Sequence, residues 1–377
     1  MERARYFSKV IFVGQFPPPI NGLTFITSRL ASALEQAGYD LAIINTTGPA
    51  GNRSVLFHAA RLAKISRALF SIASNALLGK SQVCYFTAEG GLGLIYSVML
   101  AIWARLFRLR TYIHHHSFSY IVRRRPLMKL LLACSGAEAI HICLSSGMAQ
   151  DLANCYGQAI HSIVLSNAAF VDPVASESSS PERKEITIGL LSNLTADKGL
   201  HGFIEIVRIA KRRALPIRGV LAGPIAGETD RLLVEALKQE LGVYLDYRGP
   251  VYDGEKARFF RDIDVFVFLT TYLNEAQPTV LFEAMAHGIP VISYDRGCIR
   301  SQVADGGYVF PQGTDIISET LNVLERYFQQ PGCLEAQRHA ALSHFKDERR
   351  RGQERIASLF ETTPAEVVSL IVNPNEN

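Results

Sequence analysis

Two glutamates separated by seven residues, in the segment TYLNEAQPTVLFEAMAHGIPV, carry the strongest chemical signal in the chain. Pro278 suits the first position of a helix, so Glu275 falls in the loop before that helix and Glu283 lies about a turn and a half inside it. Thr279 and Val280 precede Glu283 by about one turn and share its helix face. Amides of a first helical turn lack partners within the helix. This segment can therefore bind an anion through its backbone N–H groups, while its carboxylates accept hydrogen bonds from hydroxyl groups.

A lysine and a glycine follow the apolar run 186–192, within the segment LLSNLTADKGLHG. Lys198 can meet a diphosphate there as a point charge, and Gly199 lets backbone approach closely. Simpler explanations exist for all of these residues. Glu275 can offset the helix dipole, Glu283 can be an exposed helix residue, and Lys198 can be a surface lysine, although a cation is disfavoured at the start of a helix.

Two further segments lie at predicted strand ends in the first half of the chain. In GQFPPPING, a proline turn leads to Gly22 at the start of a helix; the segment matches neither the dinucleotide nor the P-loop fingerprint. His114, His115 and His116 end the predicted strand 110–114. Adjacent strand residues point to opposite faces, so the three cannot easily ligate one metal, whereas one of them can position a substrate.

The segment Asp262-Ile263-Asp264 matches the DxD string of metal-dependent sugar transferases. It stands just before the apolar run 265–269, where short acidic residues commonly mark a turn. We therefore interpret Asp262 and Asp264 as turn residues and predict no metal site. The six cysteines are scattered without a CxxC pair, which argues against a zinc site or a disulfide framework.

Strands alternate with helices along most of the chain, which indicates βαβ units and parallel sheets. The predicted strands are 9–14, 40–45, 82–87, 110–114 and 139–144, then 186–192, 217–222, 243–247, 265–269 and 290–294. The polar segment DPVASESSSPERK between the two runs is typical of a linker.

The predicted fold is therefore α/β, with two doubly wound parallel-sheet domains whose ligands lie at the carboxyl ends of the strands, in a cleft that the domains face. The first domain spans 1–171, the linker 172–184 and the second domain 185–334. A charged helical tail, 335–377, is expected to pack back on the first domain. The chain length of 377 residues agrees with two domains of about 150 residues each.

The composition, 48% hydrophobic and 20% charged, is that of a globular protein with a sizeable core. No apolar run approaches the ~18 residues of a membrane-spanning helix, and the first residues do not resemble a signal peptide. The cytoplasm is the simplest compartment for such a chain. Nucleic acid is disfavoured as a partner, because the chain is only mildly basic and has no recognition motif.

Positive charge is concentrated in the first half. Residues 1–180 hold 16 basic and 8 acidic residues, and the segment 61–129 holds eleven basic residues and one acid, Glu89. The segment 60–80 interleaves apolar and basic residues, so as a helix it has an apolar stripe with basic flanks. This stripe either faces the core with a solvated basic edge, or lies on an anionic membrane surface at the inner face of the membrane.

These segments together resemble the retaining glycosyltransferases of family 4, which have the GT-B architecture of two facing Rossmann-like domains. The similarity is strongest from 186 to 310. Glu275 and Glu283 match the E-x7-E motif of that family, and FEAMAHGIPV continues as the family does. Lys198 and its glycine match the lysine-glycine of the second domain, PPP-x-x-G is similar to the first loop, and Ser166-Asn167-Ala168 is similar to the segment before the linker.

The resemblance implies a role for each matching residue. Lys198, Glu275 and His116 would be catalytic, with Lys198 on the donor diphosphate, Glu275 on the donor sugar and His116 on the acceptor side. The remaining donor-binding residues would be Glu283 on the ribose, the backbone of Pro278, Thr279 and Val280 on sugar or phosphate, Gly22 on the phosphates, and Asn193. Asn193 stands where the family usually has an arginine, so Arg300 is a candidate for additional phosphate neutralisation. The family's glycine pair in the first loop is reduced to Gly22 followed by Leu23.

The implied reaction is transfer of a hexose from a UDP- or GDP-linked sugar to a hydroxyl of a glycan or lipid-linked acceptor, with retained configuration and no cofactor. Surface polysaccharide or glycoconjugate biosynthesis is the expected context. Two alternatives remain open. One is a sugar-nucleotide epimerase of the same architecture; the other is a non-catalytic partner subunit, which Asn193 favours and the retained Lys198, Glu275 and Glu283 disfavour. A dehydrogenase is disfavoured by the missing glycine fingerprint.

Overall fold

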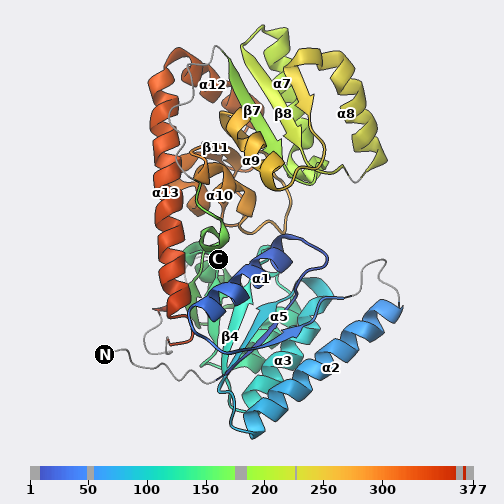
Figure 1. The fold of residues 1–377 in the computed structure, drawn as a ribbon, viewed down its shortest axis with the longest axis vertical. Coiled ribbons are helices and arrows are strands. Elements are labelled where there is room, and N and C mark those ends of the chain that lie inside the picture. The colour runs from blue at the N-terminus through green and yellow to red at the C-terminus, as the bar shows by residue number, and fades with distance from the viewer. Residues whose placement is uncertain (1–8, 49–54, 175–184, 226, 362–367, 371–377) are drawn as a thin grey trace. The chain divides into compact units, whose positions relative to one another are not determined.

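A computed structural model describes residues 9–48, 55–174, 185–225, 227–361 and 368–370. The chain forms two compact units, Met1–Phe170 with Arg350–Asn377 (unit 1) and Val171–Arg349 (unit 2). Most of the predicted linker, 172–184, lies outside the described residues, as does much of the end of the predicted tail. Each unit is an α/β structure built on its own sheet, as the alternation of strands and helices predicts (Figure 1).

Unit 1 contains a seven-stranded sheet in the order β13-β6-β5-β4-β3-β1-β2. Its strands are β1 (Val10–Gly14), β2 (Leu41–Asn45), β3 (Val83–Ala88), β4 (Arg110–His115), β5 (Ile140–Cys143), β6 (Ile160–Val164) and β13 (Val368–Leu370). All neighbours pair in parallel except β13, which runs antiparallel to β6. The strand β6 was not among the predicted strands, because its sequence IHSIV mixes polar and apolar residues.

Helices cover both faces of this sheet. They are α1 (Gly22–Gln36), α2 (Val55–Leu77), α3 (Leu94–Leu106), α4 (Ser119–Val122), α5 (Pro126–Ser135) and α6 (Ser146–Tyr156). Alternate residues of β1 point to opposite faces. Phe12 therefore packs in a core with Leu30 of α1, whereas Ile11 packs in a second core with residues of α2, α3 and α5.

The boundary between the two units falls inside α13 (Pro331–Ala357), so residues 335–349 of the predicted tail belong to unit 2. The end of the tail contributes to the core of unit 1, where Ile356 and Phe360 are buried. The Phe360 ring lies edge-on to the rings of Tyr39 and Tyr112, at centroid distances of 5.3 and 5.0 Å.

Unit 2 contains a six-stranded sheet, wholly parallel, in the order β12-β11-β10-β7-β8-β9. Its strands are β7 (Ile186–Leu191), β8 (Ile217–Ala222), β9 (Leu245–Tyr247), β10 (Val265–Phe268), β11 (Val291–Tyr294) and β12 (Gly307–Phe310). Its helices are α7 (Leu200–Arg212), α8 (Glu228–Leu241), α9 (Asp253–Asp262), α10 (Thr279–Ala286), α11 (Ile299–Val303) and α12 (Ile316–Gln329). The adjacent central strands β7 and β10 bring the two predicted donor segments to the same sheet edge.

Candidate functional site

The turn after β7 positions Lys198. A short 3-10 helix, Ala196–Lys198, ends at Gly199, whose φ of +91° is in the left-handed region that favours glycine. A Cβ atom on Gly199 would lie 2.8 Å from the backbone carbonyl of Leu269, at the end of β10. Glycine is thus required twice here, by backbone conformation and by the close approach of two strand-end loops.

We expect Gly199→Ala to lower the free energy of unfolding by about 1–3 kcal/mol, the cost of a non-glycine residue held in a strained conformation, together with a clash against Leu269. Gly313→Ala is the matched control, because Gly313 has a φ of +89° and a Cβ there meets nothing within 4 Å. Denaturant unfolding measures both variants. Equal losses in the two would show that the approach to Leu269 contributes nothing.

Lys198 and Glu275 form an ion pair, with 2.5 Å between Lys198 Nζ and Glu275 Oε2. Both side chains are largely withdrawn from solvent, at 21% and 11% exposure. The Thr270 hydroxyl donates a hydrogen bond to the same carboxylate oxygen at 3.4 Å, and the ammonium lies 4.4 Å from the centroid of the Tyr272 ring. The structure therefore joins two residues that the sequence shows only in separate segments.

The loop that carries Glu275 is held from both sides. Thr271 N donates to the carbonyl of Asp197, beside Lys198, at 2.8 Å. On the other side Cys298 N donates to Ala276 O at 2.7 Å, and a Cβ on Gly297 would lie only 2.3 Å from Glu275 O. The carboxylate is thus fixed by backbone contacts from the loops after β7 and β11, which is the preorganisation that a charge-stabilising site needs.

Helix α10 begins directly after this loop. Pro278, which the sequence predicted at the first helical position, is instead the N-cap, with φ −65° and ψ 122°, and the first helical residue is Thr279. Within the described residues, no side chain caps this end of the helix, and the Pro278 carbonyl accepts a hydrogen bond from Gln302 Nε2 at 2.8 Å. Thr279 and Val280 are half-buried. Their amides belong to the first turn, which has no intrahelical partners for its N–H groups.

Glu283 is engaged by a lysine that the sequence did not point to. Lys256 of α9 lies with its Nζ 2.6 Å from the Glu283 carboxylate, and the two side chains are 34% and 17% exposed. No motif singles out Lys256, because the contact joins two helices through the fold. Glu283 is therefore not an isolated surface residue but half of an ion pair between α9 and α10.

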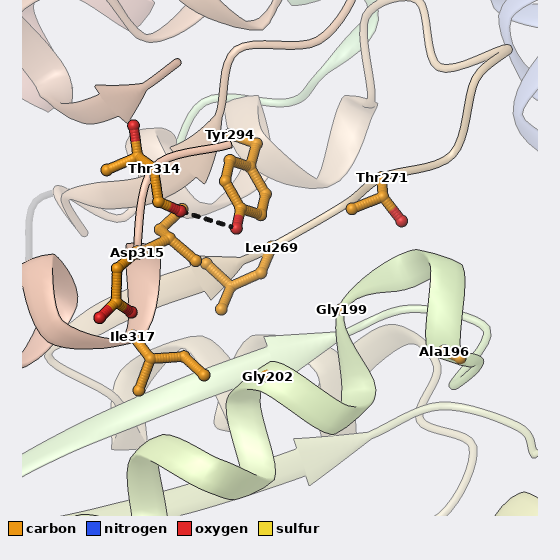
Figure 2. A pocket seen from close by; sticks show the side chains of 10 residues that line it. Ala196, Gly199, Gly202, Leu269, Thr271, Tyr294, Thr314, Asp315 and Ile317 are labelled. Atoms are coloured by element: carbon orange, nitrogen blue, oxygen red, sulfur yellow. Dashed lines mark hydrogen bonds between the residues drawn. The ribbon is translucent and has the colours of Figure 1, made fainter. Parts of the chain in front are cut away.

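A pocket of about 270 Å³ adjoins the Lys198 turn (Figure 2). Gly199, Leu269 and Thr271 line one part of it, and Tyr294 and Asp315 line another. The Tyr294 hydroxyl donates to the carbonyl of Thr314 at 3.3 Å, the bond drawn in Figure 2. Nothing in the sequence indicates this pocket, because its walls come from four separate strand-end and helix-start segments.

Neither acid of the DxD string is free. Asp262 Oδ2 lies 2.7 Å from Arg248, and Asp264 Oδ1 lies 2.6 Å from Arg338. Asp264 also accepts a hydrogen bond from the backbone N–H of Thr187 at 2.9 Å. These carboxylates join β7, α9 and α13 within unit 2, and the described residues contain no cluster of three potential metal ligands.

Two residues considered for phosphate charge lie in different settings. Asn193 is exposed in the loop after β7. Arg300 of α11 is paired with Asp295, at 2.6 Å between Nε and Oδ2. A further basic residue, Arg296, carries no sequence signal; it is half-buried, and its Nε has no hydrogen-bond partner among the described residues. Arg296 precedes Gly297, the residue that contacts the Glu275 backbone, so it belongs to the same loop system.

In unit 1, the first loop ends at the start of α1. Asn21 caps this helix by accepting a hydrogen bond from Thr24 N at 3.1 Å, and Thr24 Oγ1 accepts one from Asn21 N at 2.9 Å. Gly22 is exposed, and a Cβ there would meet nothing within 4 Å. Packing within the described residues thus does not require glycine at this position.

The histidine triplet confirms that neighbouring strand residues point to opposite faces. His114 and His115 are fully buried. His114 Nδ1 lies 2.8 Å from the Tyr85 hydroxyl on one face, and His115 Nε2 lies 2.9 Å from His141 Nδ1 on the other. His116 follows the end of β4, with its ring 3.9 Å from that of His114. Burial lowers the pKa of His116 to about 4, so its imidazole is neutral at neutral pH, and its Nε2 has no partner in the described part of the chain.

The buried histidines predict that the protein loses stability in mild acid. Burial lowers the pKa of His141 to about 4, and it holds the pKa values of His114 and His115 well below their usual 6.5. In the unfolded chain these groups titrate near 6.5. Below that pH the unfolded chain binds protons that the folded chain does not, so stability falls as the pH drops from about 6.5 towards 4.

Each such histidine contributes up to about 1.4 kcal/mol per pH unit in this window. Denaturant unfolding at about pH 7.5 and about pH 5 measures the slope. His141→Asn should reduce the slope, because it removes one of the groups whose pKa burial lowers. An unaltered slope in His141→Asn would contradict the assignment.

Comparison with known proteins finds a family model that matches part of the chain and solved structures that share the fold of the whole chain. Residues 173–326 match the family model of glycosyl transferases group 1. No curated protein sequence matches the chain. Similar solved structures cover nearly all of it, at identities that establish a shared fold alone.

HepE from Anabaena in complex with UDP-glucose is 15% identical, with a TM-score of 0.64, covering 94% of this chain and 99% of HepE. Sucrose-phosphate synthase from Thermosynechococcus elongatus is 17% identical, with a TM-score of 0.68 and coverages of 94% and 97%. The lipopolysaccharide outer core galactosyltransferase WaaB, in its apo form, is 14% identical, with a TM-score of 0.62 and coverages of 94% and 100%. The fold is thus the predicted α/β fold of the GT-B type, with two parallel-sheet units.

Proposed function

We propose, from the group 1 glycosyl transferase match of unit 2, that the protein transfers a hexose from a nucleoside diphosphate sugar to a hydroxyl group with retained anomeric configuration. The observation that carries this proposal is the Lys198–Glu275 ion pair, set in a loop that leads into the uncapped start of α10. A cation, helix amides and a carboxylate on one sheet edge provide the complementary groups for a diphosphate and for sugar hydroxyls.

In the proposed mechanism, Lys198 binds the donor diphosphate and stabilises the charge that builds up on it as the glycosidic bond breaks. The free first-turn N–H groups of Thr279 and Val280, which follow the N-cap Pro278, add to this stabilisation. Fixed groups of this kind contribute most where charge develops in the transition state, because they need not reorganise during the reaction. Glu275 orients the Lys198 ammonium group and accepts hydrogen bonds from hydroxyl groups of the donor sugar.

Glu283 is proposed to accept hydrogen bonds from the hydroxyl groups of the ribose. Its partner Lys256 neutralises one carboxylate charge in the ligand-free arrangement, at 2.6 Å. A ribose that binds Glu283 would share that carboxylate with Lys256 or displace the ammonium toward the nucleotide. Asn193 contributes no charge, so neutralisation of the diphosphate rests mainly on Lys198 and the helix start.

The acceptor side is assigned to unit 1. The neutral His116, whose Nε2 has no hydrogen-bond partner among the described residues, is proposed to bind an acceptor hydroxyl. Gly22, where a Cβ would meet nothing within 4 Å, keeps its proposed role towards the donor phosphates. We propose a glycan or lipid-linked acceptor, used in surface polysaccharide or glycoconjugate biosynthesis at the cytoplasmic face of a membrane. UDP-glucose in the HepE complex and the lipopolysaccharide core context of WaaB support a UDP-hexose and a glycan as the first compounds to try. Within the described residues, no helix is long and apolar enough to cross a bilayer.

A donor screen by mass spectrometry tests the proposal. The protein is incubated with UDP- and GDP-hexoses, with and without lipid-linked and glycan acceptors. A glycosyltransferase releases nucleoside diphosphate and forms a product heavier by one hexose when the acceptor is present. Isomerisation of the nucleotide sugar without any acceptor, which leaves its mass unchanged and is therefore followed by NMR, would establish the epimerase alternative. Binding without turnover would favour a non-catalytic subunit. NMR of the product's anomeric proton decides retention.

Chelation of divalent metals separates this mechanism from a metal-dependent one. We expect activity to survive EDTA, because the Asp262 and Asp264 carboxylates are held by Arg248 and Arg338 and are not available as ligands. Turnover is compared before and after dialysis against EDTA. Complete loss of turnover, restored by manganese, would contradict this prediction.

A further inference from the structure

One outer surface of unit 1 is both apolar and basic. It is formed by α2 and α3, which pack against each other, and by α5, which packs against α3 (Figure 1). We call it the α2–α3–α5 surface and define it by its exposed apolar side chains: Leu62, Phe70, Leu77, Leu78, Ile95, Ile102, Leu106 and Leu130. These residues range from 46% to 76% exposure, and clusters of this kind mark interaction sites on soluble domains.

Helix α2 is apolar on two opposite sides. Ile65 and Ile72 are buried in the core beneath the helix, and this half of the predicted stripe faces the core as the simpler explanation expects. Phe70 and Leu77 lie on the other side, at 75% and 76% exposure. The core therefore accounts for one side of α2 and leaves the other in contact with solvent.

Helix α3 repeats this arrangement, which was not expected from the sequence. Val98, Ala101 and Ala104 pack into the core. Ile95 and Ile102 recur seven residues apart on the outer side, at 49% and 46% exposure, and no charged residue occurs in the helix before Arg105. An outward helix face without charges is unusual for a surface that meets only water.

The fold turns some charged side chains of this region inward and leaves others exposed. Arg61 is drawn inward by its pair with Glu89, the only acid in 61–129, and Lys64 donates to the backbone carbonyl of Thr47. The inward pair cancels the one negative charge. The exposed charges that remain in that segment are all positive: Arg67, Lys80, Arg105, Arg108, Arg123, Arg124, Arg125 and Lys129.

We infer that the α2–α3–α5 surface docks on the interface of an anionic lipid bilayer, with the exposed apolar side chains in the headgroup and acyl boundary and the basic residues on lipid phosphates. Apolar side chains with a basic surround, and no exposed acid in 61–129, are complementary to such a membrane in both polarity and charge. The inference rests on the proposed function only for its consequence, which is delivery of a lipid-linked acceptor; the docking itself is independent of catalysis.

Co-sedimentation with vesicles tests the inference on the full chain. Neutral phosphatidylcholine vesicles are compared with vesicles that contain about 30% phosphatidylglycerol, at low and at high salt. We expect binding to the anionic vesicles, at least about 10-fold weaker binding to neutral ones, and loss of binding in high salt, since salt screens the attraction between the exposed basic residues and anionic lipid.

Two pairs of variants identify the surface. Phe70→Ser with Ile102→Ser should reduce binding at least about 10-fold, because apolar insertion adds to the electrostatic attraction. The matched control, Leu232→Ser with Val243→Ser, alters side chains of 56% and 78% exposure in unit 2 and should bind as the native chain does. Arg67→Glu with Lys80→Glu should reduce binding similarly, whereas Arg212→Glu on α7 should not.

The inference is overturned if the protein sediments with neither kind of vesicle. It is also overturned if the variant with Phe70→Ser and Ile102→Ser binds as well as the control with Leu232→Ser and Val243→Ser. A concentration-dependent increase in mass without lipid, removed by the Phe70 and Ile102 substitutions, would show instead that a second copy covers this surface. The donor screen with a soluble acceptor reports on catalysis separately. If the protein transfers sugar but does not bind vesicles, only the docking inference is refuted. If it binds vesicles but transfers no sugar, only the proposed function is refuted.

Discussion

Turnover of the Lys198→Ala variant is expected to fall by at least about 100-fold, the effect of removing one preorganised charge stabiliser. Among the described residues, Lys198 supplies the side-chain cation that contacts Glu275, and Asn193 cannot replace it. The loss should appear in turnover more than in donor affinity, because the charge on the leaving diphosphate is largest in the transition state. Steady-state kinetics with the donor found in the screen separate the two parameters.

The control for this variant is Lys211→Ala. Lys211 lies on α7 and donates to the backbone carbonyl of Glu240, away from the Glu275 loop, so its turnover should stay near that of the native chain. Removing Lys198 also leaves a nearly buried carboxylate without its cation, which costs stability. Circular dichroism and denaturant unfolding therefore accompany the kinetics. Near-native turnover in a folded Lys198→Ala protein would exclude the diphosphate role.

Glu275→Gln is expected to lower turnover by about 100-fold, because the amide keeps the shape of the side chain but neither fixes the ammonium of Lys198 nor accepts sugar hydroxyls as strongly. The two side chains touch at 2.5 Å, so they should act as one unit. Loss of either would then remove most of what the pair supplies, and a combined variant should lose far less than the product of the single losses.

A double-mutant cycle measures this coupling, using Lys198→Met, Glu275→Gln and the combination. Glu205→Gln is the matched control, since Glu205 forms a half-buried ion pair with Arg208 on α7, at 2.7 Å, and its loss should leave turnover unchanged. Strictly additive losses in the cycle would mean that Lys198 and Glu275 act on the substrate independently, and that their ion pair belongs only to the ligand-free protein.

The sequence predicted the fold class because most strands and helices have a characteristic local sequence pattern. Parallel strands buried on both faces appear as short apolar runs, and the helices between them keep their own periodicity. The strands β6 and β12 lack such a pattern and were not predicted. Their sequences, IHSIV and GYVF, contain polar residues or are very short, and pairing with a neighbouring strand stabilises them more than their own composition does.

The sequence alone also marked the residues around which the site is built. Lys198, Glu275 and the helix start at Pro278 stand out by residue type and spacing, since a positive φ, a helix start and an acid before it are local properties. Their pairing is not local. Lys198 and Glu275 are 77 positions apart, and Lys256 and Glu283 are 27 apart. Only the order of strands in the sheet brings these loops and helices together.

The same distinction explains the surface of unit 1. The sequence determined that α2 is apolar with basic flanks, but a helix with apolar residues all round can place either side against the sheet. The tertiary structure decided that Ile65 and Ile72 enter the core, that Phe70 and Leu77 face outward, and that Arg61 turns inward to Glu89. The physical reason is that periodicity records which residues share a face, whereas burial of that face depends on the elements that pack against it.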